Sequence, residues 1–116
     1  KPQWLGPDFF GQAEAAGARW FTLRGTGTHG VMHVDLHELC EALETVDRRD
    51  LFLDLTHTNR GKTSRSRMFA VAAQAIGFQN FFAETHPNPA LAISDGPNQL
   101  TFDQLEFLLE ALRDAT

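Results

Sequence analysis

Cysteine and long apolar runs are both scarce in this chain of 116 residues. The single cysteine, Cys40, cannot form an internal disulfide, so we expect a reducing, cytoplasmic setting. No apolar run approaches the roughly 20 residues that a membrane-spanning helix needs, which argues against a membrane role. Basic residues are outnumbered by acidic ones, and the net charge of -5 argues against a general affinity for nucleic acid.

The sequence also lacks a secretory signal segment. It opens at Lys1, without an initial methionine. We therefore expect further sequence upstream of Lys1. Its composition, with 42% hydrophobic and 22% charged residues, is ordinary for a globular protein. A chain of this length is sufficient for one modest domain, so we expect a single domain over residues 1–116.

Short apolar runs alternate with longer amphipathic segments along the chain. The runs at residues 20–23, 51–55 and 80–83 are expected strands. Helices are expected over residues 7–17, after a cap at Asp35, over residues 64–76 before Gly77, and after a capping box at Thr101. The strands recur about every thirty residues, the spacing of consecutive units in an α/β (β/α)8 (TIM) barrel.

Long polar connections follow each expected strand, at residues 24–34, 56–63 and 84–100. Such loops gather at the carboxyl edge of a parallel sheet, where α/β folds place their chemistry. The residues of interest there are Arg24, Gly25, Asp54, His57, Glu84 and Asp95. A histidine with two carboxylates suits a divalent iron, manganese or zinc ion. The alternative is that His57 and Glu84 only bind backbone groups of the loops.

Motifs in these loops resemble one known family. The run E-T-H-P-N-P at residues 84–89, followed by S-D-G-P-N at residues 94–98, is similar to the final barrel loop of 3-deoxy-D-manno-octulosonate 8-phosphate synthase. Further matches occur in order: K-P-Q at residues 1–3, R-G-T at 24–26 and D-L-T-H at 54–57. The related 3-deoxy-D-arabino-heptulosonate 7-phosphate synthases share much of this, but S-D-G-P-N favours the octulosonate branch.

The resemblance covers nearly the whole chain, yet only the second half of the family's barrel, from the end of strand five to helix eight. It implies part of a transferase that condenses phosphoenolpyruvate with an aldose phosphate, arabinose 5-phosphate above all, in lipopolysaccharide (KDO) biosynthesis. Lys1, Arg24 and Gly25 would bind substrate, since cations match the oxyanions of phosphoenolpyruvate.

The resemblance also implies a set of catalytic and metal-binding residues. His57, Glu84 and Asp95 would bind manganese, iron, zinc or cobalt in the metal-dependent class, whereas the metal-independent class binds none. His57, Asp54 and Asp95 would act in catalysis. Cys40 lies in an expected helix and does not match the family's metal-binding cysteine.

Departures from the family leave other functions open. Leu23 replaces the acidic residue that usually precedes the family's arginine, and the loop at residues 58–67 is shorter and more basic. Its basic residues fit either a phosphate site or solvated charge. Three parallel strands leave open edges, so we expect a complementary N-terminal half or self-association, and no activity alone. The alternatives are a non-catalytic half-barrel, acting in phosphate binding or assembly, and an excised half-barrel.

Overall fold

The computed structural model describes residues 8–24, 26–28, 31–93 and 96–114. A parallel sheet is formed by three strands in the order β1 (Phe21–Leu23), β4 (Leu51–Asp54) and β5 (Asn80–Phe82). In this sheet Leu23 pairs with Leu53, and Leu53 pairs with Phe81. The predicted strands are therefore confirmed, and all of them end at the same edge of the sheet.

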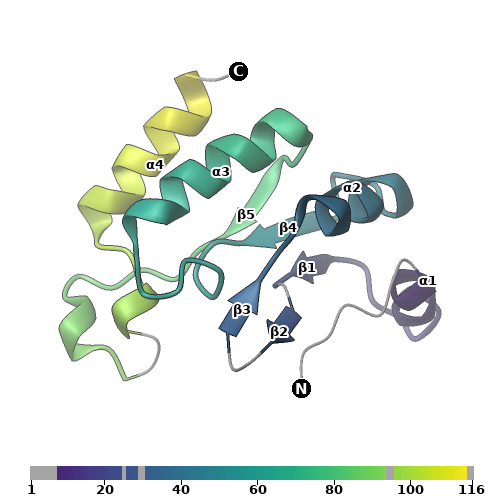
Figure 1. Ribbon diagram of the computed structural model, residues 1–116, viewed down its shortest axis with the longest axis horizontal. Helices are drawn as coiled ribbons and strands as arrows, with labels where there is room; N and C mark the ends of the chain where they lie inside the picture. Colours follow the sequence, from purple (N-terminus) through teal and green to yellow (C-terminus); the bar gives the residue numbers. More distant parts are fainter. Residues whose placement is uncertain (1–7, 25, 29–30, 94–95, 115–116) are drawn as a thin grey trace.

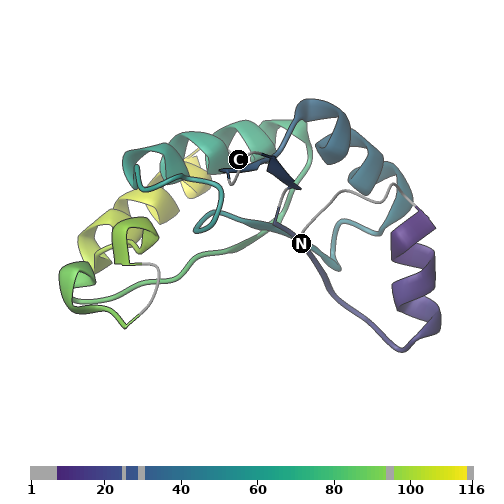
Figure 2. The ribbon, with the colours of Figure 1, turned by 60° about the horizontal axis from the view of Figure 1, so that its bottom comes forward.

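Helices alternate with these strands, as the sequence predicts. They are α1 (Asp8–Ala15), α2 (Leu36–Thr45), α3 (Ser64–Ile76) and α4 (Phe102–Asp114). Two short 3-10 turns, η1 (Pro89–Leu91) and η2 (Gly96–Asn98), lie in the connection after β5. Figure 1 shows α3 and α4 side by side, and Figure 2 shows the helices arching over one face of the sheet.

Local signals in the sequence explain where the helices begin and end. Asp35 caps α2 by accepting a hydrogen bond of 2.8 Å from the backbone N–H of Glu38. Thr101 and Gln104 form a reciprocal capping box at α4, with hydrogen bonds of 2.8 and 3.1 Å. Gly77 ends α3 with a φ of 138°, a conformation that disfavours residues with a side chain.

The core lies between the sheet and the helices. Phe21 and Leu23 of β1 and Leu51 and Leu53 of β4 are all buried on this face. The ring of Phe10 in α1 meets that of Phe21 edge to face, with centroids 5.4 Å apart. Each fully buried side chain of this size contributes about 1.5–3 kcal/mol relative to exposure. These contacts hold the strand ends, and hence the loops that follow them, at fixed positions.

The other face of the sheet has a different environment. It carries Thr22, Phe52 and Phe82, and the Phe82 side chain is 43% exposed. Within the part of the chain that the structure describes, no helix covers this face (Figure 2). Apolar side chains on an uncovered sheet face are typical of an interface that another segment or chain completes.

Some sequence-based expectations differ from the structure. Residues 24–34, expected as a loop, include an antiparallel hairpin of β2 (Thr26–Thr28) and β3 (Val31–His33). Trp20, expected in the first strand, precedes β1 and is 73% exposed. Apolar residues recur at helical spacing in α4, yet Leu108 is buried whereas Phe102 and Leu109 are exposed. None of the helices in the described ranges is long and apolar enough to span a membrane.

Candidate functional site

The connection after β4 turns around the buried carboxylate of Asp54. Its Oδ1 accepts hydrogen bonds from the backbone N–H groups of Thr56 and His57, at 2.8 and 2.9 Å. Its Oδ2 lies 2.7 Å from Nδ1 of the His57 ring. The hydroxyl of Thr58 donates to the backbone carbonyl of Asp54 at 2.7 Å. Asp54 therefore fixes both the backbone of the turn and the orientation of the imidazole.

The contact with Asp54 also assigns the tautomer of His57. An ionised carboxylate only accepts hydrogen bonds, so Nδ1 is assigned the proton, which in a neutral imidazole leaves the lone pair on Nε2. A carboxylate that holds one ring nitrogen in this way is the usual support for a histidine whose other nitrogen binds a metal or a proton. Nε2 lies on the side of Glu84.

Glu84 follows β5 and is held by its backbone. Its N–H donates to the hydroxyl of Thr56 at 2.7 Å, and its carbonyl accepts from the N–H of Leu100 at 3.0 Å. The side-chain Oε2 of Glu84 lies 4.0 Å from His57 Nε2, which is too long for a hydrogen bond. This Oε2 atom is buried and has no hydrogen-bond partner among the residues that the structure describes.

The His57–Glu84 pair brings one imidazole nitrogen and one carboxylate oxygen to the ends of neighbouring strands. It is Asp54, not Glu84 Oε2, whose side chain binds loop N–H groups. Imidazole nitrogen and carboxylate oxygen are both donor types that zinc, iron and manganese accept, and here these two atoms lie 4.0 Å apart. Across the described ranges, however, no group of three or more histidine, cysteine or acidic side chains is close enough to hold a metal.

The remaining predicted site residues are only partly placed. Arg24 directly follows β1 and is exposed. Because Leu23 pairs with Leu53, Arg24 lies at the same strand level as Asp54 on the carboxyl edge of the sheet. Lys1, Gly25 and Asp95 fall outside the described residues. The structure thus brings together Asp54, His57 and Glu84, and it places Arg24 on the same carboxyl edge of the sheet.

Asn59, which the sequence analysis missed, ties the connection after β4 to the connection after β5. Its side chain is completely buried, and its Nδ2 donates to Ser66 Oγ at 3.1 Å and to the carbonyl of Asn98 at 2.8 Å. Its Oδ1 accepts from the N–H of Gly61 at 3.0 Å. Ser66 in turn donates to the carbonyl of Leu55 at 3.0 Å. An asparagine in a polar loop gives no sign of this burial in the sequence.

Comparison with known proteins supports the motif resemblance. Residues 16–116 match the sequence model of the DAHP synthetase I family. The chain is 48% identical over 54 residues to 2-dehydro-3-deoxyphosphooctonate aldolase of Stenotrophomonas maltophilia strain K279a, covering 47% of this chain and 20% of the relative. It is 51% identical over 47 residues to the protein of that name from Xanthomonas campestris pv. campestris strain B100, covering 40% and 17%.

Solved structures match over a longer part of the chain. The phospho-2-dehydro-3-deoxyheptonate aldolase (DAHP synthase) of Thermotoga maritima superposes with a TM-score of 0.66 at 23% identity, covering 82% of this chain and 28% of that one. A truncated form of 3-deoxy-D-arabino-heptulosonate 7-phosphate synthase from the same organism gives 0.60 at 22%, covering 82% and 37%. The likeness confirms the predicted fold class, a partial (β/α)8 barrel. The matched segments span about a fifth of the curated relatives' length.

Proposed function

Because the chain belongs to the DAHP synthetase I family, we propose that it forms the phosphoenolpyruvate and metal side of the active site of an aldol-type synthase. The proposed reaction condenses phosphoenolpyruvate with an aldose phosphate to give a 3-deoxy-2-keto sugar acid phosphate. We propose arabinose 5-phosphate as the aldose, because S-D-G-P-N at residues 94–98 resembles the octulosonate branch. The relatives at 48% and 51% identity carry the octonate name.

The observation that carries this proposal is the pair formed by His57 and Glu84, with Nε2 and Oε2 4.0 Å apart at the ends of neighbouring strands. We propose that these atoms, together with Asp95, bind one divalent cation: manganese, iron, zinc or cobalt. Such a cation would supply Lewis-acid polarisation and orientation of a reacting oxygen. Asp54 acts through His57, holding its ring at 2.7 Å, and is therefore a positioning residue.

The substrate-binding side of the proposal rests on charge. Arg24 is exposed at the carboxyl edge of the sheet, at the strand level of Asp54. A guanidinium group can donate two parallel hydrogen bonds to a carboxylate or a phosphate, which suits phosphoenolpyruvate. We assign Lys1 and Gly25 to the same substrate from the motif resemblance, with Lys1 as a second cation.

We also propose that residues 1–116 act as one half-barrel, from the end of strand five to helix eight, and that activity requires an N-terminal half or another copy of the chain. The uncovered sheet face with the 43% exposed Phe82 supports this part of the proposal. One observation favours a second candidate function, a non-catalytic phosphate-binding or assembly module. The position before Arg24 is Leu23, so it carries no acidic group, and the Leu23 side chain is buried in the core.

Metal titration of the intact chain tests the metal part. We expect calorimetry with manganese chloride to give saturable binding, and Glu84→Gln and His57→Gln each to weaken it by about tenfold or more, since each removes one donor. Asp103→Asn, which removes an exposed carboxylate in α4, serves as the matched control and leaves the affinity unchanged. Equal affinities in all four proteins would exclude His57 and Glu84 as ligands.

Reconstitution tests the catalytic part. The chain is mixed with the N-terminal half-barrel of an octonate relative, and phosphate release from phosphoenolpyruvate is followed with arabinose 5-phosphate present. Release that depends on both halves and disappears in Arg24→Gln supports the synthase. Manganese binding with no phosphate release in any mixture supports the non-catalytic module instead.

A further inference from the structure

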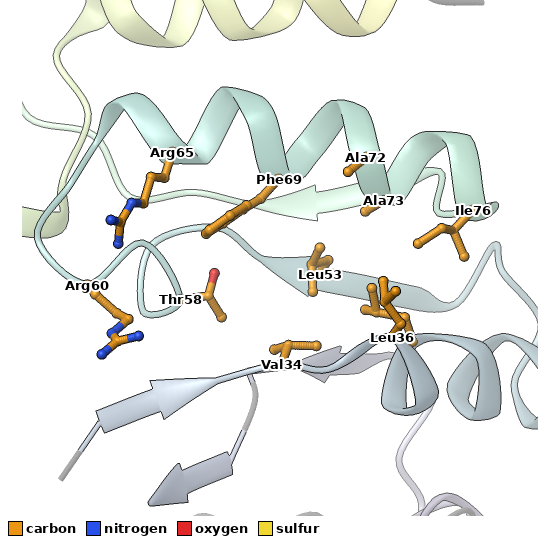
Figure 3. Close-up of a pocket in the computed structure, with 11 residues that line it drawn as sticks. Val34, Leu36, Leu53, Thr58, Arg60, Arg65, Phe69, Ala72, Ala73 and Ile76 are labelled. Atoms are coloured by element: carbon orange, nitrogen blue, oxygen red, sulfur yellow. The ribbon is translucent and has the colours of Figure 1, made fainter. Parts of the chain in front are cut away.

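A cleft between α2 and α3 lies on the helix side of the sheet. It encloses about 350 Å³. Figure 3 shows Leu36 of α2 on one wall, Phe69 and Ile76 of α3 on the other, and Leu53 of β4 between them. Leu39 of α2 also lines the cleft. The volume lies within the roughly 300–1,000 Å³ of small-molecule sites in proteins.

The walls of the cleft expose apolar surface to solvent. The Leu36 side chain is 69% exposed, and those of Phe69 and Ile76 are 37% and 36% exposed. Single exposed apolar side chains are common on protein surfaces, whereas several large ones grouped around one cleft often mark a binding site. Covering them would remove apolar area from water, which favours a ligand with an apolar body.

One end of the cleft is strongly basic. Figure 3 shows the side chains of Arg60 and Arg65 at the same end, beside Thr58, with Leu36 and Ile76 at the opposite end. Among the residues that the structure describes, neither arginine has an acidic group within ion-pair distance. Two such guanidinium groups at one mouth favour an anionic group, and carboxylates match their planar donors.

The position of Arg60 is set by its backbone. Arg60 has a φ of 56°, in the left-handed region that residues with side chains seldom adopt. The turn around it is held by buried Asn59, whose side chain accepts from Gly61 N–H at 3.0 Å and whose carbonyl accepts from Lys62 N–H at 3.0 Å. Strain of this kind persists where the surroundings impose it and is concentrated at binding sites.

From these observations we propose that the cleft binds a small carboxylic acid with an apolar body, its carboxylate at Arg60 and Arg65 and its body between α2 and α3. Neither His57 nor Glu84 lines the cleft, and Leu53 of the cleft faces the helices, whereas Thr58 belongs to the turn that links the cleft to the His57–Glu84 pair. Binding at the cleft does not rest on the proposed synthase activity.

Calorimetric titration of the intact chain with octanoate tests this proposal. We expect saturable binding, and we expect the double variant Arg60→Gly, Arg65→Gln to weaken it by about tenfold or more, because charge-assisted hydrogen bonds are lost. Glycine is chosen at position 60 because it tolerates the φ of 56°. Arg19→Gln, at an exposed arginine that does not line the cleft, is the matched control and leaves the affinity unchanged.

Two further comparisons separate the charged and the apolar parts of the site. Ala72→Trp, at an exposed position that lines the cleft, should block octanoate binding by filling the cleft. Octylammonium, which has the same tail and the opposite charge, should bind at least about tenfold more weakly than octanoate. The proposal is overturned if octanoate does not saturate, if octylammonium binds equally well, or if the arginine double variant binds like the parent. Circular dichroism checks that each variant is folded, and Arg60→Gly alone is used if the double variant is not.

Discussion

Replacing Asn59 with alanine tests whether one buried amide holds the two site loops together. The side chain makes three hydrogen bonds, to Ser66 Oγ, to the carbonyl of Asn98 and from the N–H of Gly61. Each hydrogen bond contributes about 1 kcal/mol net, so the variant should lose about 3 kcal/mol of unfolding free energy. That is a large part of the roughly 5–15 kcal/mol that stabilises a typical domain.

Urea denaturation followed by circular dichroism measures this loss. Ser66→Ala removes the bond from Asn59 and the bond to the Leu55 carbonyl, and should cost about 2 kcal/mol by the same reasoning. Gln79→Ala, at an exposed position after α3, should change the unfolding free energy by less than about 0.5 kcal/mol. If Asn59→Ala is no less stable than Gln79→Ala, the amide does not hold the loops together.

Three further perturbations have defined outcomes. Gly77→Ala should lower the unfolding free energy by roughly 1–2 kcal/mol in urea titrations, because φ is 138°, a backbone conformation that residues with a side chain rarely adopt. Thr101→Ala should lower it by about 1 kcal/mol through loss of the α4 cap, while Thr101→Ser should not. Hydrogen bonds from Arg49, first from its side chain and then from its backbone, lower the pKa of Asp47 from 3.8 to about 2. The stability they provide is therefore present above pH 3.8 and is lost as the pH falls through about 2. Acid unfolding of Asp47→Asn should lack this contribution, and an NMR titration that gives Asp47 its ordinary pKa would contradict it.

Local signals allowed much of the fold to be predicted. The bounds of α3 at Ser64 and Ile76 were predicted from the amphipathic segment that ends at Gly77, a residue that stops helices. The cap at Asp35 and the capping box at Thr101 were predicted because each depends on residues three apart. Signals of this kind act within one turn of chain and can be read without knowing the tertiary fold.

Features that depend on distant segments were not predicted. The exposure of Phe102 and Leu109 depends on which neighbours α4 has, and its helical periodicity gives only the face that could be buried. The hairpin of β2 and β3 is a different case, since it is local in sequence; it was missed because its strands are short and lie in a run with several glycines.

The same distinction applies to the candidate site. Polar residues after each strand were sufficient to select Asp54, His57 and Glu84, because parallel strands end at one edge. The sequence did not indicate that Asp54 Oδ2 binds His57 Nδ1, since this contact depends on the turn that the Thr56 and His57 N–H groups form. The burial of Asn59 likewise depends on Asn98 in the next loop.

The central claim is that His57 and Glu84 form two ligands of one cation site in a half-barrel of a synthase. The most direct test is anomalous diffraction from crystals of the chain soaked in manganese chloride. The account predicts an anomalous peak in contact with both His57 Nε2 and Glu84 Oε2, absent from crystals of Glu84→Gln. Crystals that show manganese elsewhere but none at these atoms would contradict it.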